Sequence, residues 1–282
     1  MEQKGNIIPK IIHCVWLSGE AKEGLQKKCL ESWQRVMPDF EIKEWSLANL
    51  PVEMTEHPFV KSALSARKWA FATDYIRLWA LYNYGGVYMD LDVMVYKSFT
   101  PFLAHRAFSC VEFNPRNFYN AVKKNQKEDI RGLNIEAAVM GSEMHHMWIG
   151  SMLKYYDELK FSADSKFMDS ILMPLIVTRH TIPMGFRYIP IYQELKEGVA
   201  IYGPDVFSSC YDNSICRSDE EDITYNQTRY ARHFCAHSWY ENIEDKGLMW
   251  KFKHFIIKII GEKRWNSYRR RNKENKRGLN KI

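Results

Sequence analysis

Apolar positions recur with two different periods along this chain, and the alternation between them predicts a strand–helix–strand opening. Residues 10–17 form a short, continuous apolar run, which is typical of a strand buried on both faces. Residues 22–36 place apolar side chains at helical spacing, and residues 40–45 alternate apolar and polar side chains. This βαβ order predicts the start of a parallel sheet of nucleotide-binding type.

The remaining pattern predicts an α/β fold, with a Rossmann-like, mostly parallel central sheet flanked by helices. Short helices are expected in residues 47–68, and longer ones in residues 69–84, 145–159 and 168–180. Strands are expected from residue 87 and in residues 107–113, 133–140 and 186–191. The polar residues 114–131 predict a surface excursion, and residues 198–240 predict a loop-rich segment.

The stretch 69–96 concentrates charged residues in apolar surroundings. Asp74 and Arg77 lie three positions apart in the predicted helix, so they share one face. The helix ends at two glycines, and Asp90 and Asp92 then alternate with apolar residues along the predicted strand. Both carboxylates therefore point to one side, an arrangement that is unfavourable unless a cation or a donor-rich ligand neutralises it.

Asp90 and Asp92 predict a site for Mg²⁺ or Mn²⁺, because hard divalent ions take carboxylate oxygens and leave open positions for substrate phosphates. A lone DxD occurs by chance on exposed strands, but here glycines precede it and an apolar strand surrounds it. Asp74 and Arg77 can be read as a structural ion pair. In the functional reading, Asp74 accepts hydrogen bonds from sugar hydroxyls and Arg77 donates to a sugar or phosphate oxygen.

A late cluster, His233, His237, Ser238 and Trp239, falls in a segment that can close over the nucleotide end of an open sheet. Each of these residues, taken alone, is more often an ordinary surface side chain. If the cluster is functional, His233 supplies a metal or diphosphate contact, and Ser238 and Trp239 donate hydrogen bonds to diphosphate oxygens.

Composition and charge limit the classes of partner that we expect this chain to bind. The net charge of +6 over 282 residues does not by itself imply nucleic acid, and no nucleic-acid-binding motif accompanies it. Residues 247–282 repeat apolar side chains at helical spacing among lysines and end in a basic tail. This segment predicts an amphipathic helix that either packs on the preceding domain, residues 1–246, or binds an anionic membrane surface.

The sequence also indicates the cellular compartment in which the protein is expected. Its six cysteines show no zinc-like spacing, which favours free thiols in a reducing environment. The N-terminus lacks the features of a signal peptide, and no run of about twenty apolar residues occurs. A cytoplasmic protein, with peripheral attachment to the inner face of the cytoplasmic membrane as a further option, is the expectation.

Four runs carry a resemblance to a known family: IPKIIHCVWLSG, KKCLESWQRVMPDFEIKEW, ATDYIRLWALYNYGGVYMDLDV and YARHFCAHSW. Together they resemble the DxD-containing sugar transferases of glycosyltransferase family 32, relatives of the yeast initiating mannosyltransferase and of bacterial capsular polysaccharide glycosyltransferases. The third run also looks like the catalytic core of the large clostridial glucosylating toxins. The resemblance implies a GT-A fold, a nucleotide-sugar donor and a metal-dependent, retaining transfer.

Carried over by position, the resemblance assigns roles to seven residues. Asp74 and Arg77 match donor-sugar contacts, and Asp90 and Asp92 match the metal and diphosphate site. The late nucleotide-side motif matches His233, Ser238 and Trp239, with His233 as a metal ligand. Asn134 and Glu136, at the end of a predicted strand, are further candidates for contact with donor or acceptor.

The predicted function is transfer of a hexose from a nucleotide-diphosphate sugar to a glycan or lipid-linked oligosaccharide acceptor. The family favours a UDP-hexose of the galactose type over GDP-mannose, and a role in bacterial surface polysaccharide synthesis, of capsule or O-antigen. Two other classes stay open on the sequence. One is a nucleotide-sugar hydrolase or phosphotransferase that uses the same carboxylates, and the other is a non-catalytic glycan-binding scaffold.

Overall fold

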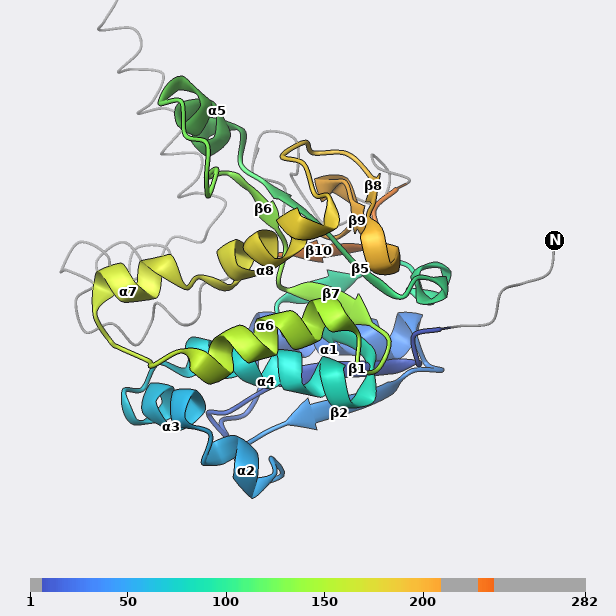
Figure 1. Cartoon of the computed structure of the whole chain (residues 1–282). Coiled ribbons are helices and arrows are strands. Elements are labelled where there is room, and N and C mark those ends of the chain that lie inside the picture. The colour runs from blue at the N-terminus through green and yellow to red at the C-terminus, as the bar shows by residue number, and fades with distance from the viewer. Residues whose placement is uncertain (1–6, 209–227, 236–282) are drawn as a thin grey trace, which may run out of the picture. The chain divides into compact units, whose positions relative to one another are not determined.

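The computed structural model describes residues 7–208 and 228–235 (Figure 1). All of these residues fall in one compact unit, residues 1–236. The predicted amphipathic helix of residues 247–282, the predicted domain boundary at 246, and the candidates His237, Ser238 and Trp239 lie outside the described residues.

A mixed sheet forms the centre of the fold. The strand order is β2 (Glu41–Trp45), β1 (Ile11–Val15), β3 (Gly86–Met89), β7 (Val139–Ser142), β5 (Ala107–Phe113), β9 (Val199–Tyr202) and β8 (Gln193–Glu194). A further strand, β6 (Leu133–Ile135), pairs with the end of β5. Strands β2, β1, β3, β5 and β9 share one direction, and β7 and β8 run against them, so the mostly parallel sheet predicted from the sequence is confirmed.

Helices pack on both faces of this sheet. On one face, α4 (Trp69–Tyr84) and α6 (Met147–Glu158) lie side by side, as Figure 1 shows. On the other face, α1 (Gly24–Val36) covers β4 (Val93–Val95). The other helical segments are α2 (Val52–Thr55), α3 (Pro58–Ser65), α5 (Pro115–Lys123), α7 (Ser165–Ser170), α8 (Met173–Thr181), α9 (Pro204–Phe207), and the 3₁₀ turns η1 (Thr100–Ala104), η2 (Ile182–Met184) and η3 (Lys196–Gly198).

Two hydrophobic clusters fill the spaces between sheet and helices. One includes Phe59, Leu78 and Trp148 from α3, α4 and α6. The other includes Trp33 from α1 and Phe207 from α9. Because each fully buried large side chain contributes roughly 2–3 kcal/mol of transfer free energy, these clusters hold the sheet rigidly between its helices.

The joint between α4 and β3 requires glycine, because of its backbone angles and its close packing. Helix α4 has the predicted bounds, and Gly85 and Gly86 adopt φ values of +61° and +105°. A Cβ on Gly86 would lie 2.6 Å from the carbonyl oxygen of Ile11 in the neighbouring strand. His13 spans the joint from β1, since its Nε2 donates to the Gly85 carbonyl over 2.7 Å and its Nδ1 accepts from Trp45 Nε1 over 3.2 Å. Burial lowers the pKa of His13 to about 4.

Several predicted elements differ in the structure. The strand expected to run through Asp90 and Asp92 is interrupted there by a turn, closed by a 3.0 Å hydrogen bond from Val93 N to the Asp90 carbonyl. The strand expected at residues 133–140 is split into β6 and β7 by residues 136–138. The helix expected at residues 168–180 is divided into α7 and α8, because Pro174 begins a new helix.

Two surface segments also differ. The excursion at residues 114–131 contains α5, which begins where the Asn114 side chain caps the Asn117 N–H and Pro115 takes the first turn. Residues 186–191 form no strand, because the Gln193 side chain bonds the backbone of Arg187 and Ile189 in place of a neighbouring strand. The loop-rich segment that begins at residue 198 also contains β9 and α9.

None of the helices within residues 7–208 and 228–235 has both the length and the apolarity needed to cross a bilayer.

Candidate active site

Asp74 and Arg77 project from one face of α4 into the protein, and each is only 6% exposed. Arg77 Nη2 lies 3.1 Å from Asp74 Oδ1, and Arg77 Nη1 donates to the Ala137 carbonyl over 2.7 Å. The guanidinium stacks over the ring of Tyr88, 4.5 Å from its centroid. Arg77 Nε is buried and has no hydrogen-bond partner among the described residues. One N–H of this arginine is therefore left unsatisfied by the described residues.

Burial and neighbouring charges shift the pKa values of Asp74 and Arg77. Burial raises the pKa of Asp74 to about 7; the Arg77 guanidinium opposes this shift, and the neighbouring Asp90 carboxylate adds to it. For Arg77, burial would lower the pKa, but the carboxylates of Asp90 and Asp74 outweigh it and raise the pKa further. Arg77 thus stays protonated at every working pH.

The turn between β3 and β4 carries Asp90 and Asp92. Asp90 Oδ1 accepts a 2.6 Å hydrogen bond from the Tyr88 hydroxyl and lies 3.5 Å from Arg77 Nη2. Helix α1 holds the strand that follows the turn, since Trp33 Nε1 donates to the Val93 carbonyl over 2.7 Å. The two aspartates converge, as the sequence predicted, but through a turn and not through alternation along one strand.

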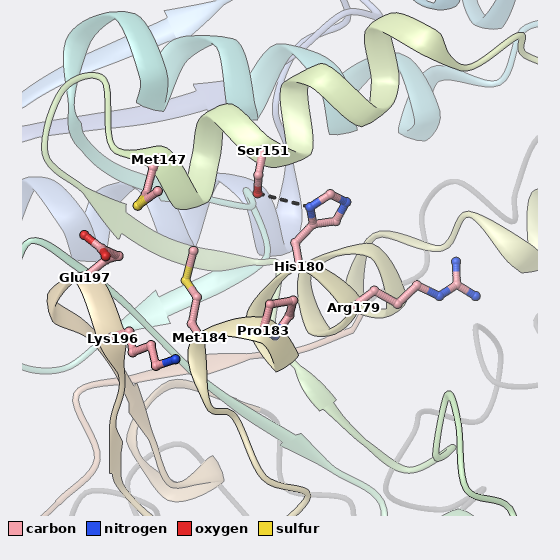
Figure 2. A pocket seen from close by; sticks show the side chains of 8 residues that line it. All are labelled: Met147, Ser151, Arg179, His180, Pro183, Met184, Lys196 and Glu197. Atoms are coloured by element: carbon pink, nitrogen blue, oxygen red, sulfur yellow. Dashed lines mark hydrogen bonds between the residues drawn. The ribbon is translucent and has the colours of Figure 1, made fainter.

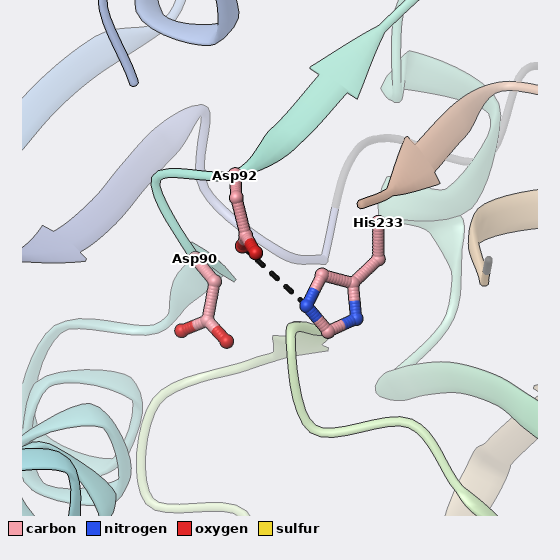
Figure 3. Close-up of side chains that lie close together, drawn as sticks. All are labelled: Asp90, Asp92 and His233. Carbon is pink, nitrogen blue, oxygen red and sulfur yellow. Dashed lines mark ion pairs between the residues drawn. The ribbon is translucent and has the colours of Figure 1, made fainter. Parts of the chain in front are cut away.

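His233 reaches the same point from far along the chain. It ends β10 (Ala231–His233), which pairs antiparallel with β4 so that His233 lies opposite Val93. The next residue, Phe234, donates its N–H to the Asp92 carbonyl over 3.0 Å. His233 Nε2 lies 3.4 Å from Asp92 Oδ1, and Figure 3 shows both side chains turned toward Asp90.

These three side chains form a candidate metal centre. One ligand atom from each of Asp90, Asp92 and His233 lies within 4.8 Å of the others, and all three residues are partly exposed. Two carboxylate oxygens and one imidazole nitrogen suit Mn²⁺ well, and the carboxylates suit Mg²⁺. Such an incomplete set of protein ligands would leave coordination positions for a substrate.

Behind His233 lies Glu136, whose Oε2 is 3.2 Å from His233 Nδ1. Burial would lower the pKa of His233, but the Glu136 carboxylate and the hydrogen bond to Asp92 outweigh it and hold that pKa well above its usual value. Burial would raise the pKa of Glu136, but the charge of His233 and the hydrogen bonds it accepts hold it lower. A divalent cation at this site would have to displace the proton on His233 Nε2.

Residues 136–138, between β6 and β7, connect the parts of the site. The Ala137 carbonyl accepts from Arg77 Nη1, and the Ala138 carbonyl accepts from Asp90 N over 2.9 Å. Glu136, a candidate for contact with donor or acceptor, is instead only 2% exposed and bonded within the protein. The signal was present in the sequence, because Glu136 is the one charged residue in the apolar run LNIEAAVM. The buried Asn134 Oδ1 has no partner among the described residues.

The structure therefore brings together Asp74, Arg77, Asp90, Asp92 and His233. Tyr88 and Glu136 complete the cluster and were not assigned these contacts by sequence reasoning. A separate pocket between α6, α8, η2 and η3 contains none of these residues (Figure 2). Its lining residues are Met147, Ser151, Arg179, His180, Pro183, Met184, Lys196 and Glu197.

Part of this chain is similar to known glycosyltransferases. Residues 24–109 match the family described as the glycosyltransferase sugar-binding region containing DXD motif. Inositol phosphoceramide mannosyltransferase 3 of Schizosaccharomyces pombe is 32% identical over 106 residues, 36% of this chain and 29% of that protein. Inositol phosphoceramide mannosyltransferase 2 of the same yeast is 25% identical over 266 residues, 90% of this chain and 64% of that protein. The chain thus spans less than two thirds of the length of these curated relatives.

Two solved glycosyltransferase structures align with this chain at low identity. The PaToxG glycosyltransferase aligns with a TM-score of 0.46 and 14% identity, over 62% of this chain and 69% of that structure. The galactosyltransferase LgtC, solved with donor and acceptor sugar analogues, aligns with a TM-score of 0.43 and 16% identity, over 80% of this chain and 87% of that structure.

The Asp90–Leu91–Asp92 turn follows a strand of the mostly parallel sheet and lies inside the region that matches the DXD glycosyltransferase family. This match over residues 24–109 agrees with the resemblance to family 32 that the sequence motifs carry.

Proposed function

We propose that this enzyme transfers a hexose, with retention of configuration, from a nucleotide-diphosphate sugar to a glycan hydroxyl, with a divalent cation at Asp90, Asp92 and His233. The observation that carries the proposal is the convergence of these three side chains beside a buried arginine whose Nε–H has no partner among the described residues. A glycosyltransferase with such a cluster has the groups that a diphosphate leaving group needs.

Asp90, Asp92 and His233 would hold Mn²⁺ or Mg²⁺. When bound, the cation neutralises the charge that develops on the departing diphosphate. The three side chains come from two segments that β4 and β10 pair together, so they are in place before a donor arrives.

Arg77 and Asp74 would bind the sugar end of the donor. In this proposal Arg77 Nε, which has no partner within residues 7–208 and 228–235, would donate to a sugar or phosphate oxygen, while the two terminal nitrogens stay bonded to Asp74 and Ala137. Asp74 accepts from a sugar hydroxyl, and such a bond favours its ionised form against the burial that raises its pKa. Retention would follow if the bond between the anomeric carbon and the diphosphate oxygen breaks and the acceptor hydroxyl attacks the same face within the ion pair, its proton passing to the departing diphosphate, without a protein nucleophile.

For the donor we infer a UDP-hexose of the galactose type, with GDP-mannose second. The yeast relatives are named as mannosyltransferases, which supports keeping mannose in the test. For the acceptor we infer a lipid-linked glycan precursor of a bacterial capsule or O-antigen, met at the inner face of the membrane. The basic residues 247–282 would favour that anionic surface, and Ser238 and Trp239 would donate to the diphosphate.

The experiment is a thermal-shift screen of UDP-galactose, UDP-glucose, GDP-mannose and the free nucleotides, each with and without Mn²⁺. A donor that raises the melting temperature only with Mn²⁺ is then incubated with glycan acceptors, and the anomeric configuration of the product is read by NMR. Metal-dependent donor binding followed by a retained glycosidic product is the expected result. Donor hydrolysis that no acceptor alters would favour a hydrolase, and absence of donor binding with metal would favour a scaffold.

A further inference from the structure

The carboxylate of Glu136 is buried behind the candidate metal centre and has both of its oxygens bonded. Oε1 accepts from the backbone N–H groups of Ala137 and Ala138, each over 3.1 Å. Oε2 accepts from the Ser208 hydroxyl over 2.9 Å and lies 3.2 Å from His233 Nδ1. A charged side chain this buried persists only where its partners satisfy it, so its position is fixed by the fold.

This arrangement decides which nitrogen of His233 can bind a cation. An ionised carboxylate is an acceptor only, so His233 Nδ1 must be the donor in its contact with Glu136. A ring with a single proton then carries it on Nδ1, and the Nε2 lone pair points at Asp92, 3.4 Å away. The other neighbour of Nδ1 is the Cys235 sulfur at 3.5 Å, which is a weak acceptor and does not compete with a carboxylate.

Glu136 also supports the rest of the centre through the backbone. The N–H groups that it binds belong to Ala137 and Ala138, whose carbonyls hold Arg77 Nη1 and Asp90 N. Glu136 therefore contacts His233 directly. It also anchors Ala137 and Ala138, whose carbonyls hold Arg77 and Asp90 in place.

We propose that Glu136 is the positioning residue of this metal centre, which fixes the ring orientation and the Nδ1–H tautomer of His233 so that Nε2 binds the cation. The inference rests on the proposed metal-dependent function and assigns a role to a residue that does not itself touch metal or donor. Carboxylates behind metal-bound histidines act in this way, and their loss typically weakens metal affinity 10–100-fold.

The experiment compares Mn²⁺ binding by the full chain and by Glu136→Gln. The amide has nearly the same shape, but its NH₂ group would face His233 or Ser208, so Nδ1 loses its acceptor. Binding is titrated by electron paramagnetic resonance, and electron spin-echo envelope modulation detects the nitrogen of a coordinated imidazole. Glu136→Gln should bind Mn²⁺ roughly 10–100-fold more weakly and lose the nitrogen modulation, while the aspartates still hold the ion.

Two further variants serve as controls for the Mn²⁺-binding measurement. His233→Ala should also lose the modulation. Glu143→Gln, which alters a carboxylate bonded to Arg106, should keep wild-type affinity and modulation. If Glu136→Gln fails to fold, Ser208→Ala replaces it, since it removes one support of Oε2 and should weaken Mn²⁺ binding in the same direction.

Wild-type affinity and undiminished modulation in Glu136→Gln, or in Ser208→Ala where it stands in, would overturn the proposal. So would wild-type protein that binds no Mn²⁺, or that binds it without nitrogen modulation. The proposed function fails separately: a protein with a Glu136-dependent, nitrogen-bound Mn²⁺ that transfers no sugar refutes the function alone. An active transferase whose Mn²⁺ ignores Glu136 refutes this inference alone.

Discussion

Arg77 Nη2 lies 3.5 Å from Asp90 Oδ1 while the same nitrogen lies 3.1 Å from Asp74 Oδ1. The sequence suggested two separate groups, one on the donor sugar and one on the metal. The structure joins them through one guanidinium, which bonds the helix carboxylate, the turn carboxylate and the Ala137 carbonyl. A change at Arg77 is therefore expected to affect both donor binding and the metal turn.

Arg77→Lys keeps the positive charge but removes the planar fork. A single ammonium cannot reach Asp74, Asp90 and the Ala137 carbonyl together and still leave a donor for the ligand. We expect kcat/KM for transfer to fall by at least about 100-fold, because a transition-state donor worth roughly 3 kcal/mol is lost. Steady-state kinetics with saturating Mn²⁺ measures this, with Arg179→Lys, whose arginine pairs with Asp129 away from the cluster, as the matched control. Equal losses in the two variants would contradict the assignment.

Gly86→Ala tests the joint between α4 and β3. A methyl group there would meet the Ile11 carbonyl at 2.6 Å and would hold a φ of +105° that side chains rarely adopt. We expect the free energy of unfolding to fall by about 3 kcal/mol, from strain and overpacking together. Gly19→Ala also has a positive φ, +70°, but has no described neighbour within 4 Å, so it should cost only about 1 kcal/mol. Urea denaturation measures both variants, and equal costs would refute the packing argument.

His13 predicts a pH dependence of stability. Its folded pKa of about 4 lies below the unfolded value of 6.5, because burial favours the neutral ring. The contribution of the neutral His13 ring to the free energy of unfolding is therefore complete above pH 6.5 and is lost as the pH falls toward 4. At about 1.4 kcal/mol per pH unit, the free energy of unfolding should decrease by about 2 kcal/mol between pH 7.5 and pH 5 from this residue. His13→Gln should remove that part of the slope in urea titrations at the two pH values. Slopes that match in both proteins would show that His13 is not the cause.

Much of the fold was predictable because it depends on local periodicity. The βαβ start and the whole of α4 follow from the spacing of apolar residues and from the glycine stop at Gly85 and Gly86. The turn at residues 90–92 was not predictable in this way. The same apolar–polar alternation occurs in one continuous strand and in two short strands separated by a turn. The turn is stabilised by long-range hydrogen bonds, such as the one from Asp90 N to the Ala138 carbonyl.

The site was predictable as far as its residue types carry chemistry. Asp74, Arg77, Asp90, Asp92 and His233 were chosen from motifs and resemblance, and the structure brings them together. The supporting contacts were not predicted, because Glu136 meets His233 across 97 positions of sequence, and Tyr88 reaches Asp90 at a turn that the sequence pattern did not reveal. Ser238 and Trp239 remain predictions from the resemblance.

Membrane attachment through the basic C-terminal segment is tested by liposome flotation. The described fold ends at residue 235, so a chain that stops at residue 246 removes none of it. With vesicles that contain anionic lipid, the 282-residue chain should float and the shorter chain should not, and added salt should reduce flotation as charges are screened. Equal flotation of the two chains would dismiss this role for residues 247–282.

In the proposed function, Asp90, Asp92 and His233 hold the cation on which sugar transfer depends. The most direct measurement is transfer from the donor identified by thermal shift, assayed with Mn²⁺ for the wild type and for Asp92→Asn. Asn keeps the shape of the side chain but removes the carboxylate charge, so the melting temperature in the absence of metal should change little. We expect metal-dependent transfer by the wild type and a loss of at least about 100-fold in Asp92→Asn. Transfer by Asp92→Asn at the wild-type rate, or by the wild type in the presence of a chelator, would contradict this expectation.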